Sequence, residues 1–509
     1  MSTGASSVAL PPPRELARVP VAWSVLSGAA LVIAVVLVAA SGRYGYHRDE
    51  LYFLRAGDEL AFGYVDQPPL TPLLARLTSE VLGSSLVGLR LVPAVAAGLV
   101  VLCTGLLARE LGAGRAGQGL AAACMAVSAF LVAVGHLMST STFDLLAWTT
   151  LSWLVVRALR DGGRSWLLVG VVAGIGLQNK ALVVFLLAGL AVALLLVGPR
   201  APLRTPWPWL AAAVALLLWA PYLLWQAANG WPQLELSRAI AAGSSGTSEP
   251  RWLFLPFQLV LVSPLLVPVW VAGLERLARD PQLRPYRAFA VAYVLLAVVF
   301  VLTGGKPYYL AGLYPVLLAA GAEPALRWAR GGATRLRAGL LTAAVALSAG
   351  VSAVLFLPLV PVQHLGGTPI VDINYDAGET VGWPAFVQTV AQVHAGLPAD
   401  ERAGAVVLAR NYGQAGALDR YRAELGLPAV YSGHNSYSEW GPPPESADPT
   451  IVTGYDRGQL LQWFASVEPA GRIDNGVGVD NDEQGTAVWI CRDRLAPWAQ
   501  LWPELRRFG

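Results

Sequence analysis

The segment VAWSVLSGAALVIAVVLVAASG, residues 21–42, is an almost unbroken apolar run. At about 20 residues it is long enough for an α-helix to cross the hydrocarbon core of a bilayer. A secretory signal peptide also carries an apolar run, but no small-residue cleavage site stands out before the tyrosine-rich stretch that follows. The segment is therefore predicted to be a retained first membrane helix.

The rest of the chain continues this pattern. Of its 509 residues, 55% are hydrophobic and only 14% are charged, which is typical of a polytopic membrane protein. Further apolar spans begin near residues 85, 117, 142, 166, 181, 208, 252, 286, 308 and 338. The run over 166–197 is too long for one helix and carries GLQNK in its middle, so we expect a hairpin there. The sequence thus predicts about eleven transmembrane helices.

The arginine-rich loops between the spans set the predicted orientation. If the N-terminus is cytoplasmic, these loops lie inside, as the positive-inside rule requires. Residues 1–20 are then a disordered cytoplasmic tail, and residues 21–359 form a transmembrane domain whose first external loop is 42–84. An odd number of helices places residues 360–509 outside a plasma membrane.

Residues 360–509 differ in character from the spans. The runs AGAVVLAR, PTIVTGY and GTAVWICR predict strands, while GQAGALDRYRAEL and RGQLLQWFA predict helices, which together favour a small extracytoplasmic α/β domain. Ligands often bind where a strand ends, here at residues 411–414, and Tyr437 or Trp440 offers a ring for stacking on a sugar. A packing domain with a surface turn is the alternative.

Composition excludes several classes of protein. The net charge of +3 and the scattered arginines make nucleic acid an unsuitable partner. Three cysteines give no disulfide framework. His47 and His136 lack the spacing of metal ligands, so no metal or other cofactor is predicted.

The first external loop carries a predicted surface helix. In PPLTPLLARLTSEVLG, residues 68–83, the apolar side chains recur at helical spacing and the Pro-Pro pair suits a helix start. Such a helix lies along the membrane surface, with Leu70, Leu73, Leu74, Leu77 and Val81 on one face.

Acidic residues open the same loop. Asp49 and Glu50 follow the first span directly, and ionisable groups at membrane depth are costly and usually functional. Because neighbouring residues on a helix point about 100° apart, the two carboxylates are not expected to act on one bond. Asp58 and Glu59, further along, fit a solvated loop equally well.

Five motifs occur in order along residues 20–330: RDELYF at 48–53, VDQPPL at 65–70, STSTFDLLAW at 139–148, GIGLQNKALV at 174–183 and GGKPYYLAGLYPVLLAAG at 304–321. Together they resemble the dolichyl-phosphate-mannose–protein mannosyltransferases and their relatives that decorate lipid A with aminoarabinose. The resemblance implies the membrane-embedded GT-C fold and transfer of a sugar from a polyprenyl-phosphate carrier. One position departs from the pattern, because the lipid A enzymes commonly have a lysine where this chain has Gln67.

The resemblance and the chemistry together give each motif residue an expected role. A lipid phosphate leaves readily, so the reaction needs a base for the acceptor hydroxyl and cations for the departing phosphate. Asp49 is the predicted base, with Glu50 as second choice or as an orienting group. A helix cap or an ion pair with Arg48 is the structural alternative for Asp49.

The other predicted site residues contact the substrate. Lys180 and Lys306, the only lysines in the chain, suit a phosphate, although Lys306 could equally be an interfacial anchor. Asp144 has a capping role as its alternative. Arg238 and Arg251 flank a loop that is expected to close over the donor. The remaining predicted contacts are Arg48, Asp66 and Tyr309.

The sequence therefore predicts a glycosyltransferase that transfers a hexose or pentose to a glycan, lipid or protein hydroxyl, and the family resemblance implies an inverting reaction. A transporter or flippase of a lipid-linked or small polar substrate is the alternative. It would place ionisable groups near the bilayer midplane, and only the GLQNK break favours it. A non-catalytic scaffold is the other alternative.

Overall fold

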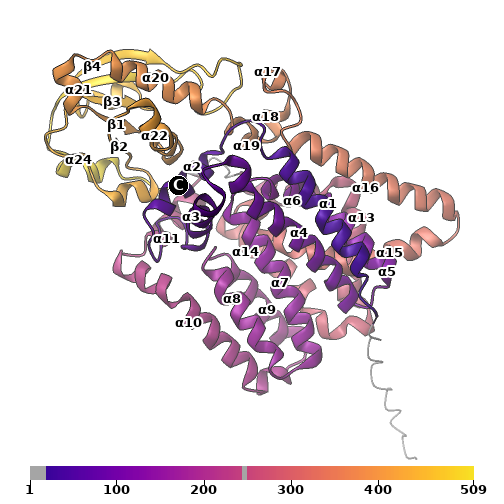
Figure 1. Cartoon of the computed structure of the whole chain (residues 1–509). Coiled ribbons are helices and arrows are strands. Elements are labelled where there is room, and N and C mark those ends of the chain that lie inside the picture. The colour runs from indigo at the N-terminus through magenta and orange to yellow at the C-terminus, as the bar shows by residue number, and fades with distance from the viewer. Residues whose placement is uncertain (1–18, 244–248) are drawn as a thin grey trace, which may run out of the picture.

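A bundle of long helices carries a smaller region with a β-sheet at one end (Figure 1). The structure is a computed structural model, and it describes residues 19–243 and 249–509. The predicted disordered tail, residues 1–20, lies almost entirely outside the described residues.

Five helical segments of the described chain are long and apolar enough to cross a membrane. They are α1 (Trp23–Ala40), α4 (Leu86–Glu110), α10 (Trp207–Ala228), η5 with α15 (Pro307–Leu313 and Tyr314–Arg330) and α16 (Thr334–Phe356). Two bent pairs raise the number to seven: α5 (Arg115–Ala126) with α6 (Ala129–Gly135), and η2–α12 (Arg251–Leu253 and Phe254–Val262) with η3–α13 (Pro264–Leu266 and Val267–Arg279).

Other helices complete the bundle. These are α7 (Thr140–Asp161), α8 (Ser165–Leu177), α9 (Val183–Val197) and α14 (Ala288–Thr303), and α11 (Pro232–Ala241) follows α10. A helix begins within a few residues of every predicted start. That eleven of them cross the membrane stays a prediction.

The predicted break at GLQNK is confirmed, because α8 ends at Leu177 and α9 begins at Val183. The Asn179 side chain holds the break to its neighbours: its amide nitrogen donates to the Thr140 carbonyl at 2.8 Å, and its oxygen accepts from the Thr71 hydroxyl at 2.7 Å. The break thus joins the start of α7 to the start of α3 (Leu70–Leu82).

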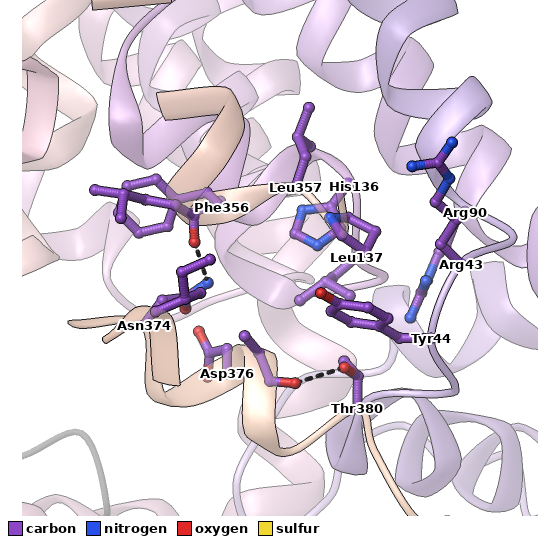
Figure 2. Close-up of a pocket in the computed structure, with 15 residues that line it drawn as sticks. Arg43, Tyr44, Arg90, His136, Leu137, Phe356, Leu357, Asn374, Asp376 and Thr380 are labelled. Carbon is purple, nitrogen blue, oxygen red and sulfur yellow. Dashed lines mark hydrogen bonds between the residues drawn. The ribbon is translucent and has the colours of Figure 1, made fainter. Parts of the chain in front are cut away.

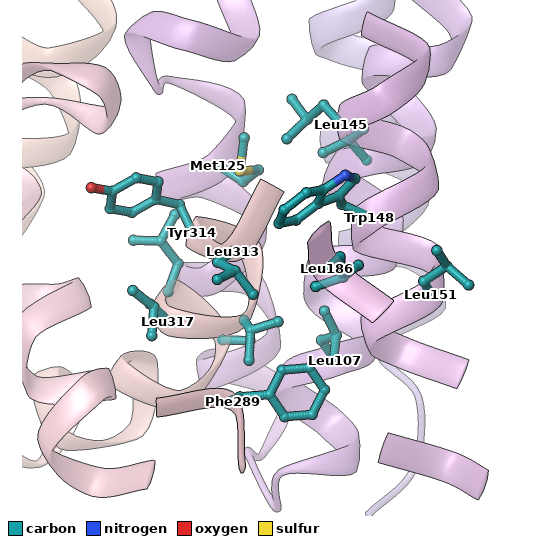
Figure 3. Packing of buried hydrophobic residues seen from close by; sticks show 14 of the residues in the cluster. Leu107, Met125, Leu145, Trp148, Leu151, Leu186, Phe289, Leu313, Tyr314 and Leu317 are labelled. Atoms are coloured by element: carbon teal, nitrogen blue, oxygen red, sulfur yellow. The ribbon is translucent and has the colours of Figure 1, made fainter. Parts of the chain in front are cut away.

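The core of the bundle is built from buried aromatic and branched side chains (Figure 3). Trp148 on α7 is fully buried, and a Cβ added at Gly312 would lie 2.5 Å from its ring. Only glycine allows this approach, so η5 packs directly on the indole. This packing fixes the position of the GGKPYY motif, residues 304–309, against α7.

The C-terminal region contains a five-stranded mixed sheet in the order β2-β1-β3-β5-β4. Its strands are β1 (Val406–Ala409), β2 (Val430–Tyr431), β3 (Thr450–Thr453), β4 (Phe464–Arg472) and β5 (Ala487–Arg494). The first three are parallel, with Val407 opposite both Val430 and Ile451. β5 and β4 are antiparallel.

One predicted helix of this region is wrong in extent. RGQLLQWFA forms only the single turn α23 (Arg457–Leu460), and β4 begins at Phe464. Residues 461–463 form a turn, and only Phe464 and Ala465 of the segment belong to β4, where Phe464 pairs with Arg494 of β5. By contrast, α22 (Tyr412–Leu425) forms where GQAGALDRYRAEL predicts a helix. α20 (Trp383–Ala395) and α24 (Trp498–Leu505) also pack in this region (Figure 1).

The predicted first external loop forms two helices, α2 (Arg48–Asp58) and α3. The helix predicted over residues 68–83 is confirmed, and its apolar face is open, with Val81 76% exposed. That this helix lies along the membrane surface stays a prediction. In contrast, α2 is covered by α22, and the two share a hydrophobic core that includes Leu51, Leu418 and Ile451. Figure 1 shows the sheet region beside α2 and α3. The C-terminal region is therefore docked on the loop; a domain boundary at residues 359 and 360 stays a prediction.

Candidate active site

The N-terminus of α2 is fixed by a capping box. His47 is the N-cap residue, and its Nδ1 lies 3.2 Å from the backbone nitrogen of Asp49, from which the neutral form of the imidazole accepts a hydrogen bond. In return, Glu50 Oε2 accepts from the His47 backbone N–H at 2.8 Å. These bonds satisfy donors that a helix start leaves unpaired, so they set the direction of the Asp49 and Glu50 side chains.

Glu50 points into the protein. It is fully buried and forms a two-bonded ion pair with Arg90 of α4, at 2.9 and 2.7 Å. Its Oε1 also accepts from the Met138 backbone N–H at 2.9 Å. Burial raises the pKa of Glu50, but the Arg90 charge and these hydrogen bonds outweigh it and lower the pKa. This geometry supports the orienting role of Glu50 over the role of a base.

Asp49 points the other way, as the helical geometry predicts. Its side chain is half-buried, and its Oδ1 accepts from the Tyr412 hydroxyl of α22 at 2.8 Å. The alternative partner, Arg48, is held elsewhere. The Arg48 guanidinium binds Glu379 at 3.0 Å and Asp482 at 2.9 Å in the C-terminal region. Asp49 is therefore held by one neutral donor rather than by a cation.

Both lysines lie at one aromatic ring. The Lys180 and Lys306 ammonium groups lie 5.5 and 5.9 Å from the centroid of Tyr308. Lys180 comes from the GLQNK break, donates to the Ser141 hydroxyl at 3.0 Å, and so reaches the start of α7. Burial lowers the pKa of Lys306 to about 8, against the opposing charges of Asp49 and Asp376. The structure thus places both predicted phosphate-binding cations at one ring, with Lys306 near enough to the predicted base, Asp49, to interact with its charge.

Two other predicted residues border this neighbourhood. Asp144 is buried on the first turns of α7, and its carboxylate lies near enough to Lys180 for the two charges to interact. Its Oδ1 has no hydrogen-bond partner among the described residues. Tyr309 packs its ring on Tyr308 at 5.3 Å and on Phe300 at 5.5 Å. That both contact a ligand held by the lysines stays a prediction.

Asp66 lies under the C-terminal region. Its carboxylate accepts from the Tyr52 hydroxyl at 2.7 Å and from the Asn435 amide at 3.2 Å. Burial raises the pKa of Asp66 to about 6, although these donors oppose the shift. Gln67, at the position where the related enzymes commonly have a lysine, is buried, and its amide has no partner within the described part of the chain.

The remaining predicted residues do not join this group. Arg238 and Arg251 are exposed, and residues 244–248 of the loop between them lie outside the described residues. Closure of this loop over a donor stays a prediction. Tyr437, predicted as a ring for sugar stacking, is 3% exposed, and its hydroxyl donates to Asp419 at 2.7 Å. Its position favours packing over stacking on a sugar.

Asp376 is a neighbour of the site that the sequence analysis missed. It lies 3.4 Å from His47 and lines a small cavity with His136 and Tyr44 (Figure 2). The cavity, about 20 Å³, has room for a single water molecule rather than a sugar. No motif or periodicity marks the INYDAG stretch, residues 373–378, and only the folded chain brings it to α2.

The His47–Asp376 pair gives a pH-dependent stability. Burial lowers the pKa of His47, but the carboxylates of Asp376 and Asp49 outweigh it and raise the pKa from 6.5 to about 9. The pKa of His47 is higher in the folded state than in the unfolded state. The pair therefore contributes its full stabilisation below pH 6.5, and this stabilisation is lost as the pH rises through 9.

We expect the melting temperature of the wild type to fall between pH 7 and 9.5. In His47→Asn, which keeps a capping oxygen, it should fall less. Equal falls in both proteins would contradict this, and His394→Asn, a change away from the pair, is the control.

The sequence of this chain is similar to sequences of known membrane glycosyltransferases. The family profile described as dolichyl-phosphate-mannose-protein mannosyltransferase matches residues 66–225. An undecaprenyl phosphate-alpha-4-amino-4-deoxy-L-arabinose arabinosyl transferase of Pseudomonas savastanoi pv. phaseolicola is 27% identical over 360 residues, 62% of this chain and 65% of the relative. The corresponding transferase 1 of Pseudomonas fluorescens is 27% identical over 56% of this chain and 53% of its own. The chain thus spans between half and two thirds of the curated relatives that it matches.

Solved structures show the fold. ArnT from Cupriavidus metallidurans in the apo state superposes with a TM-score of 0.59 at 14% identity, over 92% of this chain and 97% of that one. The same protein bound to undecaprenyl phosphate gives 0.57 at 15% identity, over 92% and 98%. The matches confirm the resemblance to polyprenyl-phosphate-sugar glycosyltransferases, and the fold is the GT-C fold.

No group of three or more His, Cys, Asp or Glu side chains in the described ranges is arranged to hold a metal.

Proposed function

We propose that this chain is a membrane glycosyltransferase that moves a sugar from a polyprenyl-phosphate carrier to an acceptor hydroxyl at the outer face. The observation that carries the proposal is the pair of ammonium groups at the Tyr308 ring, one of which, that of Lys306, lies near enough to the half-buried carboxylate of Asp49 to interact with its charge. Base and cations in one place are what transfer from a lipid phosphate requires.

The proposed reaction is a single displacement. Asp49 takes the proton of the acceptor hydroxyl, and the acceptor oxygen attacks the anomeric carbon. The bond from that carbon to the phosphate oxygen breaks, and its electron pair leaves with the polyprenyl phosphate. Lys180 and Lys306 stabilise the charge on the departing phosphate as point charges. Attack opposite the leaving group inverts the anomeric configuration.

The carrier is proposed as undecaprenyl phosphate, supported by the names of the two curated relatives and by the lipid bound to the superposed structure. The proposed topology places the N-terminus in the cytoplasm and residues 360–509 outside the plasma membrane. In this arrangement α3 lies at the outer surface of the bilayer, with its exposed leucines and Val81 toward lipid. The proposed acceptor hydroxyl belongs to a glycan, a lipid or a protein.

The donor assay tests this proposal. Purified protein in detergent is given a panel of undecaprenyl-phosphate sugars with membrane extract as the source of acceptor, and the release of undecaprenyl phosphate is measured. We expect release with one donor, dependent on the acceptor. Uptake of a labelled lipid-linked sugar into vesicles without release would support the transporter alternative, which the comparisons do not favour.

The lysines give a separate prediction on binding. Each Lys→Met change, at Lys180 or Lys306, removes one charged contact to phosphate, which is worth about 1.5–3 kcal/mol and thus a tenfold or larger rise in Kd. The measurement is equilibrium binding of undecaprenyl phosphate to each variant in detergent. Lys306→Arg, which keeps the charge, is the control. Wild-type affinity in both methionine variants would place the phosphate elsewhere.

A further inference from the structure

The carboxylate proposed as the base is touched by a residue from the far end of the sequence. The Tyr412 hydroxyl donates to Asp49 Oδ1 at 2.8 Å across a separation of 363 residues. The catalytic loop and the C-terminal region therefore meet at the reacting group itself. The hydrogen bond can position Asp49 only if neighbouring residues hold Tyr412 in place.

The local sequence places Tyr412 at a strand end. β1 ends at Ala409, and Asn411 caps α22 by accepting from the Gln414 backbone N–H at 2.8 Å through its side-chain oxygen. Tyr412 is the first residue of this helix. A capped helix start directly after a buried strand is one of the more rigid positions in a fold, so the tyrosine backbone is well fixed.

The Tyr412 ring is held on several sides. Its centroid lies 4.8 Å from that of Tyr52 and 4.9 Å from that of His434, and the Arg48 guanidinium lies 5.3 Å from it. Burial lowers the pKa of His434 to about 3, so the imidazole is neutral. Its Nδ1 accepts from the Tyr412 backbone N–H at 3.3 Å, and its Nε2 donates to the Gly509 carbonyl at 2.8 Å.

Two glycines allow α22 to approach α2 this closely. A Cβ added at Gly413 would lie 2.8 Å from Arg48 Cβ, and one added at Gly416 would lie 3.0 Å from the Leu51 backbone. Larger side chains at these positions would push the helices apart. The reach of the Tyr412 hydroxyl to Asp49 thus depends on a packing that runs along the whole contact.

We propose that Tyr412 is a positioning residue for the reaction: its hydrogen bond fixes Asp49 Oδ1 and leaves Oδ2 facing the acceptor hydroxyl. The inference rests on the proposed function, and it gives the C-terminal region a part in the chemistry. Burial and the Asp49 charge hold the pKa of Tyr412 well above its usual range, so its hydroxyl remains a donor.

Other charged groups also act on Asp49. His47 comes from the cap of its own helix, Lys306 from the segment before η5, and Asp66 from the segment before α3, and each is affected by the Asp49 charge. The Arg48 guanidinium lies 5.3 Å from the centroid of the Tyr412 ring. A test of Tyr412 must therefore leave these groups in place, which removal of a single hydroxyl does.

The test compares two tyrosine hydroxyls. Tyr412→Phe keeps the ring contacts and removes only the donor to Asp49. Tyr437→Phe is the matched control, because its hydroxyl donates to a different carboxylate, Asp419, at 2.7 Å. The readouts are kcat, KM for the accepted undecaprenyl-phosphate sugar, and the pH profile of kcat/KM.

In Tyr412→Phe we expect kcat to fall about tenfold, the loss of one hydrogen bond to a charged group, with KM unchanged. The acidic limb of the pH profile should move toward higher pH, because the ionised carboxylate loses its donor. Tyr437→Phe should keep the wild-type limb. A wild-type kcat and pH profile in Tyr412→Phe would overturn the proposal.

Failure of the proposed function has a different signature. If Asp49 is not the base, both Asp49→Asn and Tyr412→Phe retain wild-type activity. If only the positioning role of Tyr412 is wrong, Asp49→Asn is inactive and Tyr412→Phe has wild-type activity. Should Tyr412→Phe not fold, Gly413→Ala displaces the helix that carries the hydroxyl. It is expected to lower kcat in the same way, and a wild-type rate in this variant would again overturn the proposal.

Discussion

Asp49→Asn lowers kcat by about 10²–10⁴-fold, the usual loss when a general base is removed, and leaves donor binding intact. Asparagine has the shape of aspartate and still offers an oxygen to the Tyr412 hydroxyl, so the packing of α2 on α22 is kept. What it lacks is the ability to take the acceptor proton. The measurements are kcat for undecaprenyl phosphate release and Kd for undecaprenyl phosphate.

The matched control for this variant lies on the same helix. Asp58 is at the other end of α2, and its exposed side chain pairs with Arg76 at 2.8 Å. Asp58→Asn removes a carboxylate of the same type from the same loop and should retain wild-type activity. Equal activity of Asp49→Asn and wild type would remove Asp49 from the chemistry and move the base elsewhere.

The second large effect is on stability. Glu50→Gln breaks a buried ion pair and leaves the Arg90 charge, which is 1% exposed, without a counter-charge. Removal of one partner of such a pair typically costs about 3–5 kcal/mol. We expect a clear fall of the melting temperature in detergent and a loss of folded protein, rather than a folded and inactive enzyme.

An exposed pair on α2 supplies the comparison. Glu59 pairs with Arg55 at 3.2 Å on the surface of the protein. Glu59→Gln should change the free energy of unfolding by only about 0.5 kcal/mol, because solvent screens such pairs. If Glu50→Gln melts like the wild type but has no activity, Glu50 belongs to the chemistry and its orienting role is wrong.

The helices of the bundle could be predicted because their signal is local. Apolar length and helical spacing mark each span, and the break at GLQNK is visible as polar residues within an apolar run. The same is true of α3 and of the short apolar strands. Even so, RGQLLQWFA is predicted as a helix, whereas its last two residues belong to β4, and the pairing of Phe464 with Arg494 of β5 is a long-range contact that local spacing does not reveal.

The site could be predicted only in part. Motif order marked Asp49, Lys180 and Lys306, but the common position of the two lysines at the Tyr308 ring depends on the folded bundle. The contacts that separate Asp49 from Glu50 in role join distant parts of the chain, such as Tyr412 to Asp49 across 363 residues. No local pattern encodes a contact of that separation, because neither residue lies in a motif with the other.

The measurement that tests the central claim most directly is a structure of this protein with undecaprenyl phosphate bound. The account predicts the phosphate within hydrogen-bond distance of Lys180 and Lys306, with the Asp49 carboxylate facing the same space. A phosphate held away from both lysines, for example by Arg238 and Arg251, would contradict it.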